Sequence, residues 1–210
     1  MTLPDINTFS TGDIILFDGD YASSRIIDDV IHSKWSHVGM VVKDPNFLFN
    51  CDKKNGIYLY ESDGKDMIDV DSNSKLFGIQ LVDLNEKILK YSGNIAYRKL
   101  NWNKSHEYID NIMKIVYNTT YHKSYDWNPI DLLDPLIYQK YWILDEIFRI
   151  DPRQDNRFFC SSFVSYIYTQ LGLLPKSTNW SLIYPQYFST VFELSDGGCL
   201  GEIQMIKTTH

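Results

Sequence analysis

The feature that most constrains this chain is a change in hydrophobic periodicity near its middle. Before it, apolar runs of strand length are joined by short, turn-rich segments, at 12–17, 37–42, 57–62, 78–84 and 94–100. After it, residues 105–118 and 160–171 carry apolar residues at helical spacing, and a short strand near 201–206 ends the pattern. Strands first and helices later predict one α+β domain over residues 1–210, built on a mainly antiparallel sheet.

The run RFFCSSFVSYIYTQLG (157–172) places a cysteine in the first turn of an amphipathic helix. Counted from Cys160, apolar residues recur at i+3, i+4, i+7 and i+11, and Gly172 ends the helical pattern. The unpaired N–H groups and the macrodipole at a helix N-terminus favour a thiolate, which is the nucleophilic form of cysteine. A buried cysteine at this position can equally be an inert core residue, and position alone favours that interpretation.

Two serines follow Cys160 directly and are rival nucleophiles. At about 100° per residue, the side chains of Ser161 and Ser162 point away from the stripe that carries the cysteine. We therefore interpret both as residues of the helix turn.

A cysteine nucleophile needs a base, and the base needs a third group that fixes its tautomer. Among the five histidines, His37 opens an apolar strand, where packing gives no reason for an imidazole. Glu61 ends the next strand, and its carboxylate can accept a hydrogen bond from that imidazole if the two strands pair. Asp63 is a rival for this role. The alternative interpretation of His37 and of the two acidic residues is that each is a strand-end residue that makes only local hydrogen bonds or faces solvent.

Taken in order, four segments resemble the circularly permuted branch of the NlpC/P60 papain-like superfamily, with its YiiX/YebB-type bacterial and poxvirus-type members. They are GDIILF (12–17), SHVGMVV (36–42), YLYES (58–62) and FFCSSFVSYIYTQLG (158–172). In that family the sheet and its histidine precede the helix that carries the cysteine. The resemblance implies a permuted papain-like fold, in which an antiparallel sheet or partial barrel packs against the nucleophile helix. It departs from the family at an aromatic-rich insertion of about 119–156.

The resemblance implies Cys160 as the nucleophile, His37 as the base and Glu61 as the orienting residue of a catalytic triad. The implied activity is that of a thiol hydrolase (amidase or peptidase) or an acyltransferase, which cleaves an amide or ester through a thioester intermediate. No residue corresponds to a side chain that stabilises the oxyanion, so backbone N–H groups at the start of the Cys160 helix are assigned that role. A catalytically inactive module that binds a lipid or peptide is the alternative.

Composition limits the classes of partner and cofactor that this chain is expected to bind. The net charge of −7 and the absence of a basic run exclude nucleic acid as a partner, because phosphate binding needs clustered cations. Three widely spaced cysteines predict neither a disulfide framework nor a metal pair, so no cofactor and no metal are expected. Two of them, Cys51 and Cys199, lack a helix signal and are predicted to be structural.

The N-terminus lacks a secretory signal, and no apolar run reaches the length of a membrane span. A cytoplasmic location is therefore expected, or the virion or host cytoplasm for a viral protein. The expected substrate is a small molecule, a lipid-linked compound or a peptide. The aromatic stretch 138–148 reads as a lid or acyl-chain groove, with a supporting core layer as the alternative. The lid interpretation favours a lipid-linked substrate and leaves peripheral membrane contact open; the sequence predicts no oligomeric state.

Overall fold

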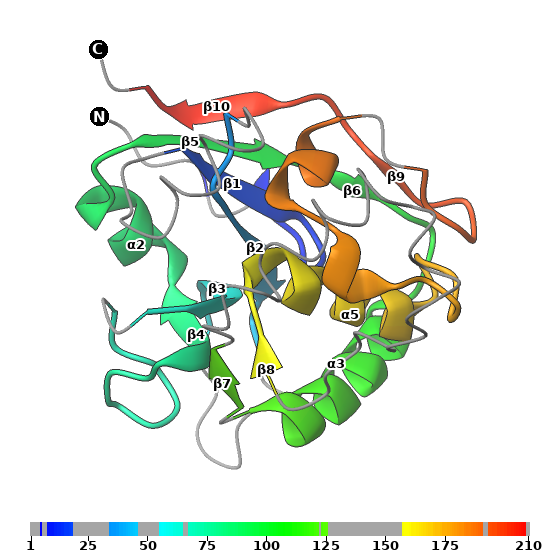
Figure 1. Ribbon diagram of the computed structural model, residues 1–210, viewed down its shortest axis with the longest axis horizontal. Helices are drawn as coiled ribbons and strands as arrows, with labels where there is room; N and C mark the ends of the chain where they lie inside the picture. Colours follow the sequence, from blue (N-terminus) through cyan, green and yellow to red (C-terminus); the bar gives the residue numbers. More distant parts are fainter. Residues whose placement is uncertain are drawn as a thin grey trace, which may run out of the picture.

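The computed structural model describes residues 5, 8–18, 34–45, 55–64, 67–121, 123–125, 157–190 and 193–208. Its strands are β1 (Ile14–Asp18), β2 (His37–Lys43), β3 (Ile57–Asp63), β4 (Gly78–Asp83), β5 (Asn94–Arg98), β6 (Leu100–Asn101), β7 (Ser124–Tyr125), β8 (Arg157–Phe158), β9 (Cys199–Leu200) and β10 (Gln204–Lys207). Its helices are α2 (Leu84–Lys90), α3 (His106–Thr120) and α5 (Cys160–Leu171), with short 3₁₀ segments η3 (Trp180–Leu182) and η4 (Pro185–Ser189) (Figure 1). The chain therefore folds as the mixed α+β structure that the periodicity predicts.

Eight of the strands form one sheet in the order β10-β5-β1-β2-β3-β4-β7-β8, and β6 pairs with β9 in a second, two-stranded sheet. Strands β1 to β4 are a meander in which each strand runs antiparallel to the next. Only the short β7–β8 pair among the named strands is parallel. The mainly antiparallel sheet expected from the short connections is therefore confirmed.

The sheet separates two apolar cores, because successive side chains of a strand point to opposite faces. On one face, Val38 and Met40 belong to a cluster with Phe163 of α5. On the other face, Val41 belongs to a cluster with Ile88 of α2. Helices α5 and α2 thus cover opposite faces of the sheet (Figure 1).

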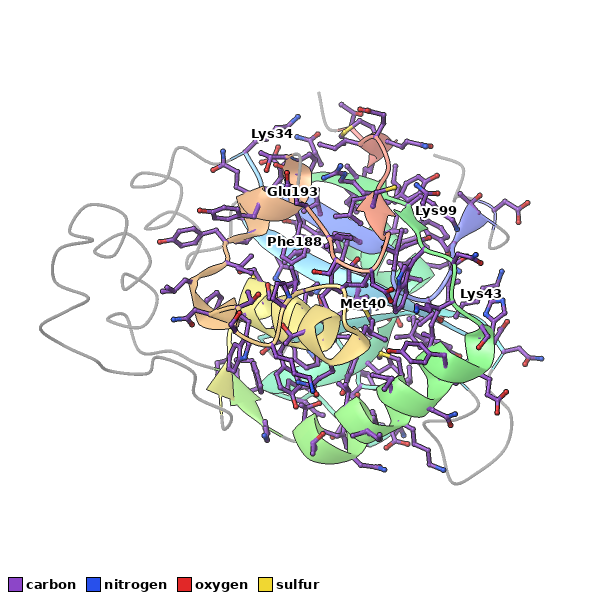
Figure 2. The ribbon with its side chains drawn as sticks, turned by 90° about the vertical axis from the view of Figure 1, so that its right-hand side faces the viewer. Lys34, Met40, Lys43, Lys99, Phe188 and Glu193 are labelled. Atoms are coloured by element: carbon purple, nitrogen blue, oxygen red, sulfur yellow. The ribbon has the colours of Figure 1, made fainter. Side chains whose placement is uncertain are left out.

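Helix α5 begins and ends where its sequence pattern predicts. Cys160 is its first residue, and Gly172 follows it in the left-handed conformation with φ of 81°, which favours glycine. The apolar face is buried against β2 and β3. In Figure 2, Met40 and Phe188 lie in this interior layer, whereas Lys34 and Glu193 lie at the periphery.

Helix α3 begins after Ser105, whose hydroxyl accepts a hydrogen bond from the Tyr108 N–H at 3.2 Å. Serine is a favoured N-cap residue because its hydroxyl accepts from a free N–H of the first turn. The helix buries Met113 and Val116 against the α5 layer.

The expectation that one strand spans 78–84 is wrong at its end. The strand stops at Asp83, and Leu84 begins the seven-residue helix α2, which the sequence analysis did not predict. The Asp83 carboxylate accepts a hydrogen bond from the Glu86 N–H at 2.8 Å, and this N-cap turns the chain out of the sheet. Leu84 and Ile88 are one helical turn apart, so α2 buries both in the second core.

Arg98, at the end of β5, links the C-terminal segment to the sheet through hydrogen bonds. Its guanidinium donates hydrogen bonds to the backbone carbonyls of Phe188, Thr190, Leu200 and Gly201. Only 7% of Arg98 is exposed. Residues about a hundred positions apart in the sequence are therefore held together by one side chain.

Two expectations fall outside the described residues: the environment of Cys51 and the structure of the aromatic stretch 138–148, with most of the 119–156 insertion. Within the part of the chain that the structure describes, no helix combines the length and apolar character needed to cross a membrane.

Candidate active site

His37 is the first residue of β2 and lies where β1 ends and β2 begins. Its backbone pairs with Phe17, and its ring packs at a tilt against the Phe17 ring with a centroid distance of 5.4 Å. Only 8% of the residue is exposed. Packing and strand pairing together restrict the orientation of the imidazole.

The carboxylate of Glu61 is the nearest acidic partner of this imidazole. Strand β3 pairs with β2, and Glu61 Oε2 lies 2.7 Å from His37 Nε2. Asp63, the rival named from the sequence, is farther away, with 4.0 Å between its Oδ2 and the same nitrogen. The structure therefore places Glu61 within hydrogen-bonding distance of His37 Nε2 and Asp63 beyond that distance.

Glu61 is fully buried, and its second oxygen is also hydrogen-bonded. Oε1 accepts from Gln80 Nε2 at 3.0 Å and from Lys87 Nζ at 2.8 Å. Gln80 is directly opposite Glu61 in the β3–β4 register. Three donors from β2, β4 and α2 thus fix the position of one carboxylate.

Lys87 lies on α2 and also contacts Asp63, with 2.7 Å between Nζ and Oδ2. Only 3% of Lys87 is exposed, and its ammonium lies over the Phe17 ring at 5.7 Å from the centroid. Sequence reasoning missed both Lys87 and Gln80. A signal for Lys87 exists, because Asp83 is a good N-cap residue and Leu84 and Ile88 have helical spacing, which places a short helix beside β3.

Cys160 reaches the same imidazole from the other core. It is 5% exposed, belongs to the cluster that α5 forms with the sheet, and lies close enough to His37 to raise the pKa of the imidazole. Since Nε2 of His37 faces Glu61, Nδ1 is the ring nitrogen available to the thiol. His37 therefore links a sulfur on the α5 side of the sheet to a carboxylate on the α2 side.

The charges around His37 favour its protonated form. Burial alone would lower the pKa of His37, but the charges of Asp63 and Cys160, with hydrogen bonds to Cys160 and Glu61, raise it to about 10. Burial would raise the pKa of Glu61, but Lys87 and His37 lower it to about 2. Burial would lower the pKa of Lys87, yet Glu61 and Asp63 raise it above its ordinary value. At neutral pH two carboxylates face two cations.

The other residues weighed from the sequence lie elsewhere or have other partners. Ser162 Oγ donates to the Phe159 carbonyl at 2.9 Å, as expected of a helix-turn residue. Ser161 is fully buried, and its hydroxyl has no hydrogen-bond partner within the described ranges. Cys199 is a free cysteine exposed on β9, and its structural role stays a prediction. His106 is exposed at the start of α3.

The same cluster contains donor types that metals use. His37, Glu61 and Asp63 offer ligand atoms that all lie within 4.8 Å of one another. Lys87, however, donates to both carboxylates, so a metal ion would have to displace its buried ammonium as well as the His37–Glu61 hydrogen bond. The arrangement fits a histidine oriented by a carboxylate better than it fits a metal centre.

These residues define a buried thiol–imidazole–carboxylate site in an α+β fold. No family model matches the sequence, and no curated protein matches it. Among solved structures, the chain is similar to the crystal structure of the metalloprotein yiiX from Escherichia coli O157:H7, with 16% identity and a TM-score of 0.49. The alignment covers 95% of this chain and 97% of that one. At this level of similarity no function carries over, so function has to be argued from the geometry of the site.

Proposed function

We propose that this protein is a thiol hydrolase or acyltransferase of the permuted papain-like type, folded as a single domain over residues 1–210. Cys160 is the nucleophile, His37 the general base and acid, and Glu61 the residue that orients His37. The observation that carries the proposal is the buried contact between Glu61 Oε2 and His37 Nε2 at 2.7 Å, with Cys160 close enough to His37 to raise its pKa. A thiol, an imidazole and a carboxylate in this order form the arrangement that acyl transfer by cysteine requires.

The reaction proceeds in two halves. In the resting thiolate–imidazolium pair the proton of Cys160 resides on His37, and the sulfur attacks the carbonyl carbon of an amide or ester. The tetrahedral intermediate collapses as His37 protonates the leaving nitrogen or oxygen, which leaves an acyl thioester on Cys160. Water, or another acceptor with an O–H or N–H group, then attacks the thioester while His37 takes its proton. The acyl group leaves, and the thiolate–imidazolium pair is restored.

The buried charges support this assignment. A His37 pKa of about 10 means that the imidazole holds its proton at neutral pH, which is the state that pairs with a thiolate. The short contact with Glu61 fixes which ring nitrogen carries the proton toward the carboxylate. The other nitrogen is then oriented toward the sulfur.

The start of α5 supplies donors for the oxyanion. The first N–H groups of a helix have no partner inside it, and the N-cap residue Phe159 makes no side-chain cap hydrogen bond. These N–H groups lie at the cysteine itself, where the carbonyl oxygen becomes negative. They are the oxyanion donors of this proposal.

Acetylation by p-nitrophenyl acetate tests the proposal without knowledge of the natural substrate, because a nucleophilic thiol attacks any activated ester. The expected result is rapid release of p-nitrophenol and a gain of one acetyl group, mapped to Cys160 by peptide mass spectrometry. His37→Ala should slow acetylation by a factor of about 10² to 10⁴. Cys160→Ala should abolish it, and EDTA should leave the rate unchanged.

The other two cysteines are internal references in the same experiment. Cys199 is exposed on β9, so it reports the reactivity of an ordinary surface thiol. Equal, slow acetylation of Cys51, Cys160 and Cys199, unaffected by His37→Ala, would contradict the proposal and support an inactive binding module.

A further inference from the structure

Lys87 is buried beside the thiol, imidazole and carboxylate of the proposed triad, although the triad itself does not require a lysine. The three reacting or orienting groups are complete without it, yet its ammonium is almost fully buried beside them. Removing an ammonium from water costs several kcal/mol unless its partners compensate. Its partners here are Glu61 Oε1 at 2.8 Å and Asp63 Oδ2 at 2.7 Å.

Lys87 supplies one of the two positive charges that face the carboxylates of this site. Glu61 and Asp63 supply two negative charges, and Lys87 and a protonated His37 supply two positive ones. Without Lys87, two carboxylates would face one imidazolium in a buried site. Like charges this close make protonation of one carboxylate easier. A protonated Glu61 would no longer provide the negative charge that stabilises the imidazolium.

We propose that Lys87 is a positioning residue of this site, whose ammonium keeps Glu61 ionised and directed at His37 by binding the carboxylate oxygen that His37 does not use. The inference rests on the proposed function. It extends the site from β2, β3 and α5 to α2, the helix on the opposite face of the sheet.

Several described elements contribute to the environment of the Lys87 ammonium, besides β2 and β4, whose His37 and Gln80 bind the same Glu61 carboxylate. Strand β3 presents Glu61 and Asp63, and β1 presents the Phe17 ring. Tyr91, just after α2, also interacts with the lysine charge, which opposes the increase that burial causes in the pKa of the phenol. Among these groups, only the two carboxylates are negatively charged at neutral pH.

The test measures the acetylation rate of Cys160 as a function of pH in the full-length chain. Lys87→Met keeps the length and apolar stem of the side chain and removes its charge. It should move the half-maximal point of the acid limb upward by about one pH unit or more, which is about a tenfold lower rate at a fixed pH on that limb. The rates of variant and wild type should converge as the pH rises.

Two further variants separate positioning from a general structural role. Asp63→Asn in the Lys87→Met background removes one of the two repelling carboxylates, so the acid limb should return toward that of the wild type. Lys90→Met is the matched control on the same helix, because Lys90 is exposed and pairs with the exposed Glu86. Its pH profile should coincide with that of the wild type.

Circular dichroism at each pH verifies that the variants are folded. If Lys87→Met does not fold, the test uses the double variant Lys87→Met/Asp63→Asn and the single variant Asp63→Asn. Asp63→Asn should keep the acid limb of the wild type, because Lys87 still pairs with Glu61. An acid limb of Lys87→Met that overlaps the wild type overturns the inference, as does a decrease by the same factor at every pH. A wild type whose Cys160 reactivity does not depend on His37 overturns the proposed function itself.

Discussion

Two buried cations, Lys87 and Arg98, are stabilised in different ways. Lys87 binds two carboxylates, whereas Arg98 binds four backbone carbonyls. Both are less than a tenth exposed. Carboxylates titrate and carbonyls do not, so the hydrogen-bonding partners of Lys87 can change their charge with pH and those of Arg98 cannot. The hydrogen bonds of the Arg98 guanidinium are therefore suited to a permanent structural link. The charged cluster around Lys87 is suited to a site in which a neighbouring group gains or loses a proton.

The difference also follows from the geometry of the two side chains. The planar guanidinium offers five N–H donors in a fixed fork, which matches carbonyls that come from two separate segments. The ammonium of Lys87 is a compact point charge, which matches two carboxylate oxygens on one strand. The first arrangement joins distant chain segments, and the second sets the charge beside His37.

The largest expected effect comes from Glu61→Gln, which leaves His37 and Lys87 without their shared carboxylate. Breaking a buried ion pair in this way costs about 3–5 kcal/mol of unfolding free energy. Urea unfolding at neutral pH measures it. A loss below about 1 kcal/mol would show that the charged cluster contributes little, and the contrast with Arg98 would fail.

Arg98→Met should cost about 2–4 kcal/mol, because the carbonyls of 188, 190, 200 and 201 lose their buried donor. The loss should be the same at every pH between about 5 and 9, since neither partner titrates there. Urea unfolding over this range checks both statements. If the loss of unfolding free energy depended strongly on pH, a titrating group would contribute to the stabilisation by Arg98. Arg98 and Lys87 would then not differ in this respect.

The pH dependence of the His37 cluster has a definite sign. Its pKa is raised from 6.5 to about 10, so the stability that His37 contributes is fully present below 6.5 and is lost as the pH rises toward 10. The difference in unfolding free energy between wild type and His37→Ala should therefore shrink over that interval, with a slope of at most about 1.4 kcal/mol per pH unit. A difference that stays constant would contradict the raised pKa.

Glu61 acts in the opposite direction. Its pKa is lowered from 4.5 to about 2, so its contribution is present above 4.5 and is lost as the pH falls toward 2. The stability difference between wild type and Glu61→Gln should decrease over that acidic interval. Acid titrations of both proteins, followed by circular dichroism in urea, measure it.

The smallest effect is expected for Lys90→Met, three residues from Lys87 on the same helix. Its ion pair with Glu86 is exposed, and pairs of this kind contribute about 0.3–0.5 kcal/mol. Urea unfolding of this variant checks that burial, and not membership of α2, makes Lys87 important. A cost comparable to that of Lys87→Met would remove this distinction.

The sequence was sufficient wherever the pattern is local. The period of 3.6 after Cys160 and the glycine at 172 defined α5, because a helix is stabilised by neighbours three and four residues apart. The alternation along β2 and β3 placed His37 and Glu61 on one face of paired strands, which is why their side chains could be expected to meet. The roles assigned to these residues remain predictions for the experiments above to test.

The boundaries of short elements were less accessible to sequence. Asp83, Leu84 and Ile88 read equally as the end of a strand or as a capped helical turn, and seven residues are too few for periodicity to decide. The N-cap hydrogen bond of Asp83 and the burial of the two apolar residues resolved this ambiguity. Both depend on the sheet being present beneath them.

By itself, the sequence determined the α+β class, the cysteine in the first turn of a helix and the strand-end histidine and glutamate. Only the tertiary structure decided that Lys87 lies in the interior, since a lysine on a short helix is ordinarily solvated. It also decided that His37 contacts Glu61 and lies close to Cys160 of the other core. The physical reason is that ion pairs between residues 24 and 26 positions apart, and hydrogen bonds across about a hundred, depend on how whole elements pack, which no local pattern records.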